Sequence, residues 1–149
     1  MTCTLDTNVL VYTLPDPDNR KRGIARELLI RATRPGSATL LLQALAEFSN
    51  VGVRKFGLDI GSIHRRVRDW REVIPVHAAE DEDLFAALDL VRDHRLDFWD
   101  ALMCATASRA GLRYLLTEDL QDGRRLGNLT IVNPFSPDNA ALIERILPA

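Results

Sequence analysis

Apolar and polar residues form two kinds of pattern along this chain, short apolar runs and apolar positions at helical spacing. Together these patterns predict alternating strands and helices. Short apolar runs suit buried strands at residues 1–5, 38–42, 73–76, 114–116 and 130–132. Apolar residues at helical spacing predict helices at residues 19–33, 43–56, 60–72, 80–92, 98–110 and 140–147. Strands that alternate with helices are typical of a parallel sheet covered on both faces. The pattern therefore predicts a three-layer α/β/α sandwich around a central, mainly parallel sheet of about five strands.

Local signals at the ends of these elements refine the prediction. Asn19 suits the N-cap of the first long helix, and residues 9–14 read as a short apolar turn after the first strand. Three large aromatic residues occur at apolar positions of helices, where they either belong to the core or line a groove for a partner. Helical spacing requires buried faces, so we expect them in the core; they are Trp70, Phe85 and Trp99.

Composition limits the class of protein. The chain has 149 residues, 46% of them hydrophobic and 27% charged, which fits one folded domain over residues 1–149. No apolar run approaches about 18 residues and no charged segment leads into one, so we expect neither a signal peptide nor a membrane span. Cys3 and Cys104 are far apart and outside any C-x-x-C pair, which argues against a thiolate metal site and favours a reducing, cytoplasmic location.

The net charge of −2 means that any contact with nucleic acid must come from local basic clusters. Seventeen of the 19 basic residues are arginines, whose planar head matches phosphate groups. Two clusters lie near the expected edge of the sheet: Arg20, Lys21 and Arg22, and Arg124 with Arg125. Each cluster is either a phosphate-binding rim or a solvated surface.

Acidic residues occur where the predicted strands end. Asp6 follows the first strand, Glu47 lies early in the helix after the second, and Asp119 follows the strand at residues 114–116. In parallel α/β sheets the functional crevice lies at the carboxyl ends of the strands. Asp100 joins the other three only if its helix also begins at that edge.

Carboxylates that converge repel one another unless cations or protons neutralise them. Oxygen-only ligands suit Mg²⁺ or Mn²⁺, and sites of this kind commonly serve phosphoryl chemistry. The three histidines stand apart from one another, which argues against a zinc site; they are His64, His77 and His94.

Each acid also has a structural alternative. Asp6 could cap the segment that follows it, and Asp100 could be the N3 residue of a helix that Asp97 caps. Glu47 could be an exposed helix residue, and Asp119 could begin a turn. Spacing alone does not choose between the structural and the functional interpretation.

The sequence around the acids provides a further indication. The segments LDTNVLVY (5–12), ALAEFSNV (44–51), FWDALM (98–103), LLTEDLQDG (115–123) and IVNPF (131–135) together resemble the PIN-domain family, in particular its VapC-like toxin ribonucleases. The resemblance implies that Asp6, Glu47, Asp100 and Asp119 are catalytic acids, and that Asp6, Asp100 and Asp119 hold one or two Mg²⁺ or Mn²⁺ ions.

The resemblance also implies supporting residues and partners. Asn8 and Thr117 would orient the carboxylates, and Asp122 would be a further acid close by. The implied reaction is hydrolysis of RNA to 5′-phosphate and 3′-hydroxyl ends, by a toxin that inhibits translation or growth. A cognate antitoxin whose C-terminal segment covers the crevice, and a homodimer that extends the RNA groove, are the implied protein partners.

Four other interpretations compete with this one. A haloacid dehalogenase-type phosphatase needs a second Asp where this chain has Asn8, and a phosphoacceptor receiver domain needs a late Lys, whereas Lys21 and Lys55 are both early. A non-catalytic PIN-like module that binds RNA or protein remains the main alternative, although all four acids are present. A purely structural α/β protein would lack stabilisation by a divalent metal.

Overall fold

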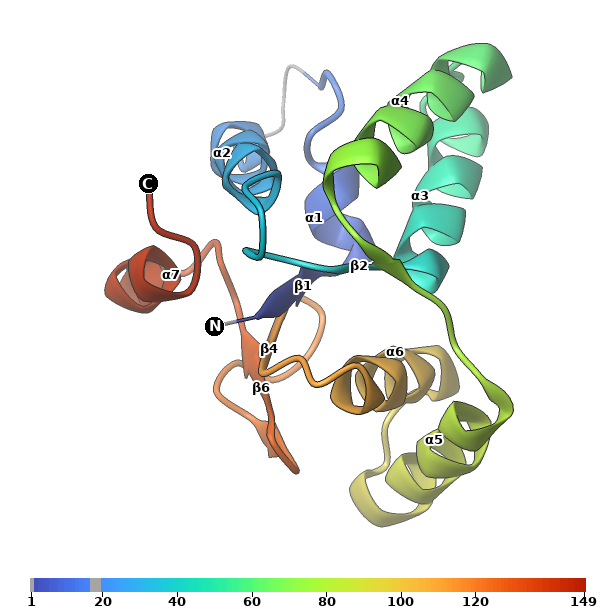
Figure 1. Ribbon diagram of the computed structural model, residues 1–149, viewed down its shortest axis with the longest axis vertical. Helices are drawn as coiled ribbons and strands as arrows, with labels where there is room; N and C mark the ends of the chain where they lie inside the picture. The colour runs from blue at the N-terminus through green and yellow to red at the C-terminus, as the bar shows by residue number, and fades with distance from the viewer. Residues whose placement is uncertain (1, 17–19) are drawn as a thin grey trace.

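The computed structural model describes residues 2–16 and 20–149 and consists of strands and helices that alternate along most of the chain (Figure 1). The strands are β1 (Cys3–Leu5), β2 (Leu40–Leu41), β3 (Val76–His77), β4 (Tyr114–Leu116), β5 (Arg125–Leu126) and β6 (Leu129–Val132). The helices are α1 (Thr7–Val11), α2 (Arg22–Ala32), α3 (Leu42–Arg54), α4 (Ile60–Val73), α5 (Asp81–His94), α6 (Phe98–Arg109), a 3₁₀ turn η1 (Pro137–Asn139) and α7 (Ala140–Ile146).

The main sheet has the strand order β1-β4-β6-β5, and β1, β4 and β6 run parallel. A parallel pair of β2 and β3 continues it on the β1 side, where Cys3 bridges to Ala38. Because the long strands are parallel, the residues that follow β1 and β4 meet at one edge. Leu5 lies opposite Leu116 in this register. The mainly parallel sheet is confirmed. The two-residue antiparallel strand β5 was not predicted, and the strand expected at residues 73–76 has the wrong bounds, because Val73 is the last residue of α4 and β3 covers Val76–His77.

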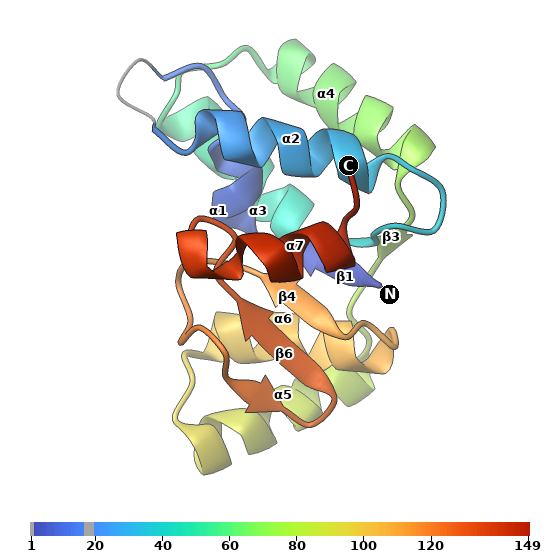
Figure 2. The same cartoon turned by 90° about the vertical axis from the view of Figure 1, so that its left-hand side faces the viewer.

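Helices cover both faces of this sheet, as predicted. Turning the molecule shows α7 in front of the strands and α5 and α6 behind them, while α2 lies beside α7 (Figure 2). The helices α3 and α4 form an antiparallel pair on the β2–β3 side (Figure 1). The three-layer α/β/α arrangement is thus confirmed.

The core lies between these layers and is built from aliphatic side chains. Leu5, Leu115 and Ile131, from the three long strands, are completely buried. Under α3 and α4 the core continues with Phe48 and Trp70, whose ring centroids lie 4.8 Å apart. Trp70 is therefore a core residue, as expected.

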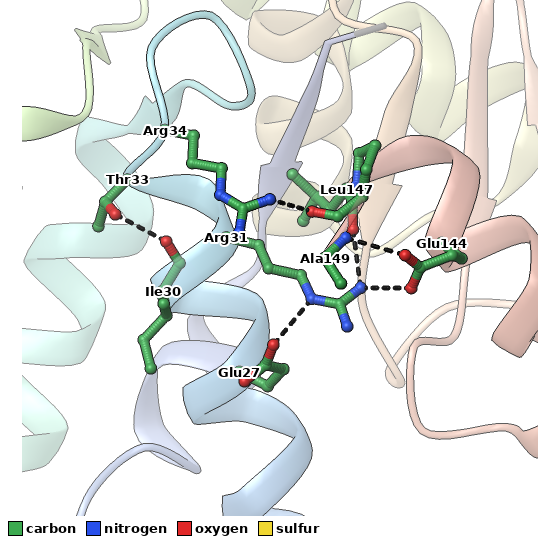
Figure 3. A network of polar contacts seen from close by, with 9 residues as sticks. Glu27, Ile30, Arg31, Thr33, Arg34, Glu144, Leu147 and Ala149 are labelled. Atoms are coloured by element: carbon green, nitrogen blue, oxygen red, sulfur yellow. Dashed lines mark hydrogen bonds and ion pairs between the residues drawn. The ribbon is translucent and has the colours of Figure 1, made fainter.

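The end of the chain is fastened to α2 by polar contacts (Figure 3). Arg31 donates from Nη1 to the Glu144 carboxylate at 2.7 Å and to the Leu147 carbonyl at 2.8 Å. Arg34 donates to the Pro148 carbonyl at 2.6 Å. These contacts join the segment from α7 onward to α2 and the residues just after it, and the buried side chains of Ile143 and Ile146 add apolar contacts.

Two local predictions differ from the structure, and a third lies outside the described residues. The expected apolar turn at 9–14 is wrong in part, because residues up to Val11 belong to a short helix that starts directly after Asp6. Phe85 and Trp99 were expected in the core, yet they are 65% and 59% exposed, because helical spacing identifies an apolar face of a helix without determining whether another element covers it. The predicted cap Asn19 lies outside the described residues.

Within the described residues, no helix is both long and apolar enough to cross a membrane.

Candidate active site

Asp6 forms the floor of the site at the junction of β1 and α1. Its backbone is extended and it is the N-cap of α1, where Oδ1 accepts the N–H of Thr7 at 2.6 Å. Oδ2 accepts the Thr117 hydroxyl at 2.7 Å. Only 5% of Asp6 is exposed. The capping role and a buried, hydrogen-bonded carboxylate therefore coexist in the same residue.

Thr117 directly follows β4 and connects three parts of the site. Its hydroxyl donates to Asp6 and accepts the side-chain amide of Asn8 at 3.1 Å and the backbone N–H of Asp119 at 3.1 Å. Asn8 also approaches Asp6 Oδ2 at 3.4 Å. Asp119 follows on the exposed rim. These contacts place the predicted supports Asn8 and Thr117 against the carboxylate that they were expected to orient.

Glu47 comes from the second turn of α3 and is held through both of its oxygens. Thr7 donates its hydroxyl to Oε2 at 2.8 Å, and Gln43 donates its side-chain amide to Oε1 at 2.9 Å. Thr7 follows Asp6 directly, so one short segment contacts both acids.

Asp100 lies in the first turn of α6, which Asp97 caps by accepting the Trp99 N–H at 3.2 Å. The same amide of Gln43 that binds Glu47 also donates to the Trp99 carbonyl at 3.0 Å. This bond ties the start of α6 to the start of α3. The structure therefore brings Asp100 to the edge where the other three acids lie.

The charges of these carboxylates act on one another. Burial raises the pKa of Asp6 to about 6; the hydrogen bonds from Thr117 and Thr7 oppose this shift, and the charges of Asp119 and Asp100 add to it. Burial likewise raises the pKa of Asp100, with further contributions from Asp97, Asp119 and Glu47. The four predicted acids thus share one electrostatic environment.

The donor set suits a hard divalent cation. Among the described residues, no Lys, Arg or His forms an ion pair with any of the four acids. Their side chains, as placed, do not form a group of three that could ligate one ion. The oxygen-only chemistry, the uncompensated buried charge and the buried Asn8 Oδ1, which has no hydrogen-bond partner there, nevertheless fit Mg²⁺ or Mn²⁺.

The cysteines take no part in such a site. Both are free and buried. Burial raises the pKa of Cys3 and of Cys104 to about 12, and the charges of Asp100 and Asp6 add to the shift at Cys104. These raised pKa values keep both thiols protonated near neutral pH.

The other predicted site residues are spread more widely. Asp122 accepts the N–H of Asn133 at 2.8 Å and the side-chain amide of Asn139 at 2.9 Å, so its carboxylate already fastens the loop before α7. Arg124 donates to the carbonyl of His94 at 3.0 Å.

The remaining basic residues fall into two groups. Arg20, Lys21 and Arg22 lie at the start of α2. Arg125 pairs with Thr130, which lies opposite Tyr114 at the other end of β4, so the structure does not bring Arg125 to the acids.

A second polar cluster beside the site was not predicted. Glu118, between Thr117 and Asp119, accepts hydrogen bonds from the Tyr12 hydroxyl and the Lys21 ammonium group. Lys21 also lies 5.2 Å from the ring centroids of Tyr12 and Phe135. No sequence pattern links positions so far apart. By contrast, the i,i+4 spacing of Gln43 and Glu47 on a helix was a readable signal for their contact.

Comparison with known families matches residues 3–126 to the PIN domain. The chain belongs to the PIN domain family. The resemblance inferred from the sequence is therefore confirmed at the level of the family. A comparison with curated proteins gave no match.

Solved structures with this fold include proteins of toxin–antitoxin systems. A toxin–antitoxin complex from Klebsiella pneumoniae matches with a TM-score of 0.65 and 21% identity, over 89% of this chain and 98% of that one. VapBC2 from Rickettsia felis, bound to a promoter DNA fragment, matches with a TM-score of 0.64 and 18% identity, over 88% of this chain and 97% of that one. VapC20 of Mycobacterium tuberculosis, a toxin that cleaves the sarcin-ricin loop, matches with a TM-score of 0.62 and 18% identity, over 78% of this chain and 91% of that one. The TM-scores show that this chain shares their fold, and at these identities the similarity shows the fold alone.

Proposed function

We propose that this PIN domain is a Mg²⁺- or Mn²⁺-dependent endoribonuclease and the toxin of a toxin–antitoxin pair. The observation that carries the proposal is that Asp6, Glu47, Asp100 and Asp119 lie at one edge, close enough for their charges to act on one another, with no cation paired to them among the described residues. A fold tolerates such a cluster when a bound cation compensates it. Membership of the PIN family supports the same conclusion.

In this proposal Asp6, Asp100 and Asp119 hold one or two ions. When bound, such an ion would act as a Lewis acid that activates water and neutralises charge on the phosphate under attack. Thr117 and the Thr7 N–H keep the Asp6 carboxylate in one orientation, since each donates to a different oxygen. The buried position of Asp6 keeps bulk water away from this oxygen pair.

The substrate in this proposal is RNA, cut to 5′-phosphate and 3′-hydroxyl ends. Arg20, Lys21 and Arg22, at the start of α2, supply positive charge for the RNA backbone, a contact that does not read bases. Lys21 already pairs with Glu118 beside Asp119, which supports its position at the rim. Arg125 lies at the opposite end of the sheet and has no part in this contact.

The proposed protein partners are an antitoxin and a second copy of the chain. The solved toxin–antitoxin complexes with the same fold support an antitoxin partner. In our proposal the C-terminal segment of the antitoxin covers the crevice. Trp99 next to Asp100, and Leu42 at the start of α3, are 59% and 50% exposed and offer apolar surface at this place.

The test is cleavage of a total bacterial RNA pool by the purified protein, free of any partner, with Mn²⁺, with Mg²⁺ and with EDTA. The Asp6→Asn variant is compared with Asp138→Asn, the same change at an exposed position. We expect cleavage that EDTA and Asp6→Asn abolish and that Asp138→Asn leaves intact. Absence of cleavage, with Mn²⁺ still raising the melting temperature, would favour the non-catalytic RNA- or protein-binding module instead.

A further inference from the structure

Gln43 occupies a bridging position between two of the acidic elements. One side-chain nitrogen, Nε2, donates to Glu47 Oε1 at 2.9 Å and to the Trp99 carbonyl at 3.0 Å. An amide nitrogen carries two hydrogens, so both of its donor positions are used. The first acceptor is an acid of α3, and the second belongs to the first turn of α6, next to Asp100.

The second oxygen of Glu47 is held from the opposite direction. Thr7 donates its hydroxyl to Oε2 at 2.8 Å, and the backbone N–H of Thr7 binds Asp6 at 2.6 Å. Glu47 is therefore fixed at both oxygens by neutral donors from two elements, and no basic side chain among the described residues pairs with it. Neutral donors orient the carboxylate without cancelling its charge.

The carbonyl oxygen of the Gln43 amide adds a second observation. It is buried and has no hydrogen-bond partner within the described part of the chain. A buried acceptor without a partner lowers stability, so the net contribution of this amide to folding is small even though Nε2 makes two bonds. A side chain of this kind, placed between two carboxylate-bearing elements, suits a role in the site better than a role in stability.

We propose that Gln43 is a positioning residue: it orients Glu47 and fixes the first turn of α6, and with it Asp100, relative to α3. The inference rests on the proposed function and deepens it. Loss of a side chain that orients the carboxylates around a metal typically lowers metal affinity or activity by 10–100-fold. Gln43 acts through the two acids and does not itself touch the substrate.

The variant that tests this is Gln43→Met, which keeps the length of the side chain and removes both donated bonds. The control is Ser49→Ala, which removes a 2.7 Å side-chain bond to the Leu45 carbonyl on the same helix and touches no acid. The assay follows cleavage of a labelled single-stranded oligoribonucleotide pool with Mn²⁺. We expect Gln43→Met to lower kcat about tenfold and leave KM within about twofold, and Ser49→Ala to change neither.

A double-mutant cycle separates positioning from a merely structural effect. In a Glu47→Ala background, Gln43→Met should lower kcat by less than its effect in the wild-type protein, because one of its two targets is already lost. Equal losses in both backgrounds, or full activity of Gln43→Met, would overturn the inference.

A readout independent of RNA cleavage separates this inference from the proposed function. The Mn²⁺ concentration for half of the rise in melting temperature should increase about tenfold in Gln43→Met and stay unchanged in Ser49→Ala. If the wild-type protein cuts no RNA but this midpoint shifts, the ribonuclease proposal fails and the role of Gln43 stands. If neither kcat nor the midpoint changes, the role of Gln43 is overturned.

Discussion

Replacing Asp6 by Asn should make the metal-free protein more stable, although it removes the central acid of the site. Asp6 is 5% exposed, and burial raises its pKa from an ordinary 3.8 to about 6. A shift of this size corresponds to about 3 kcal/mol of penalty on the ionised carboxylate in the folded state. Asn carries no charge and therefore avoids this penalty.

The gain is reduced by one lost hydrogen bond. Asn can still accept the Thr7 N–H through its oxygen, but the Thr117 hydroxyl then faces an amide nitrogen instead of Asp6 Oδ2. The loss costs about 1 kcal/mol. The net expectation at pH 8 is a gain of about 2 kcal/mol, or roughly 4–8 °C in Tm for a chain of this size.

The sign of the pH dependence follows from the raised pKa. Between pH 3.8 and about 6 the folded state binds a proton at Asp6 that the unfolded state has released, so this carboxyl favours unfolding increasingly as pH rises through that range. The advantage of Asp6→Asn should therefore be complete above pH 6 to 7 and disappear toward pH 4.

The assay is urea and thermal unfolding in EDTA at several pH values, with Asp138→Asn as the exposed control. Saturating Mn²⁺ should reduce the difference in stability between Asp6→Asn and the wild-type protein, because the ion stabilises only the protein that retains Asp6. If Asp6→Asn is no more stable than the wild-type protein at pH 8 in EDTA, then the buried charge of Asp6 does not lower the stability of the metal-free protein, and this reasoning is refuted.

Three further predictions concern stability away from the acids. Phe48→Ala, at a completely buried position, should cost about 3–5 kcal/mol in urea unfolding. Arg109→Met leaves the buried Asp83, now bonded to Arg109 Nε at 2.7 Å, without its cation, and should cost about 3–5 kcal/mol near neutral pH. Gly57→Ala should destabilise by about 1 kcal/mol because Gly57 has φ of +62°, whereas Gly23→Ala, on open helix surface, should stabilise by roughly 0.5–1 kcal/mol. Thermal melts in which Gly57→Ala raises Tm, or Gly23→Ala lowers it, would refute this reasoning.

Much of the fold could be predicted because strand and helix periods are strong local signals. The strand at Tyr114–Leu116 has the predicted bounds, and Gly111, with φ of +76°, follows the end of α6 as a helix stop should. The same periodicity led to a wrong prediction of burial for Phe85 and Trp99, which are both exposed. A helical repeat identifies an apolar face, but which elements cover that face depends on the assembled structure.

The site was predictable in its acids and less so in their partners. Asp6 and Asp119 could be assigned to one edge because they follow parallel strands. The sequence contained no signal that Thr7 would bind Glu47, since the two residues lie on different elements 40 positions apart. The hydrogen bond from the Asn139 amide to Asp122 could not be predicted either, because it depends on how the last loop packs.

The pairing of β1 with β4 has a consequence for the synthesis of this protein. The Thr117 hydroxyl that binds Asp6 is separated from it by 111 positions, and Asp119 comes later still. A chain still on the ribosome that has not yet released β4 therefore holds Asp6 and Glu47 but lacks Asp119 and the hydrogen bond that orients the first acid. In the proposed role as a toxin, the protein would stay inactive toward RNA until the segment from β4 to Asp119 had left the ribosome and β4 had paired with β1.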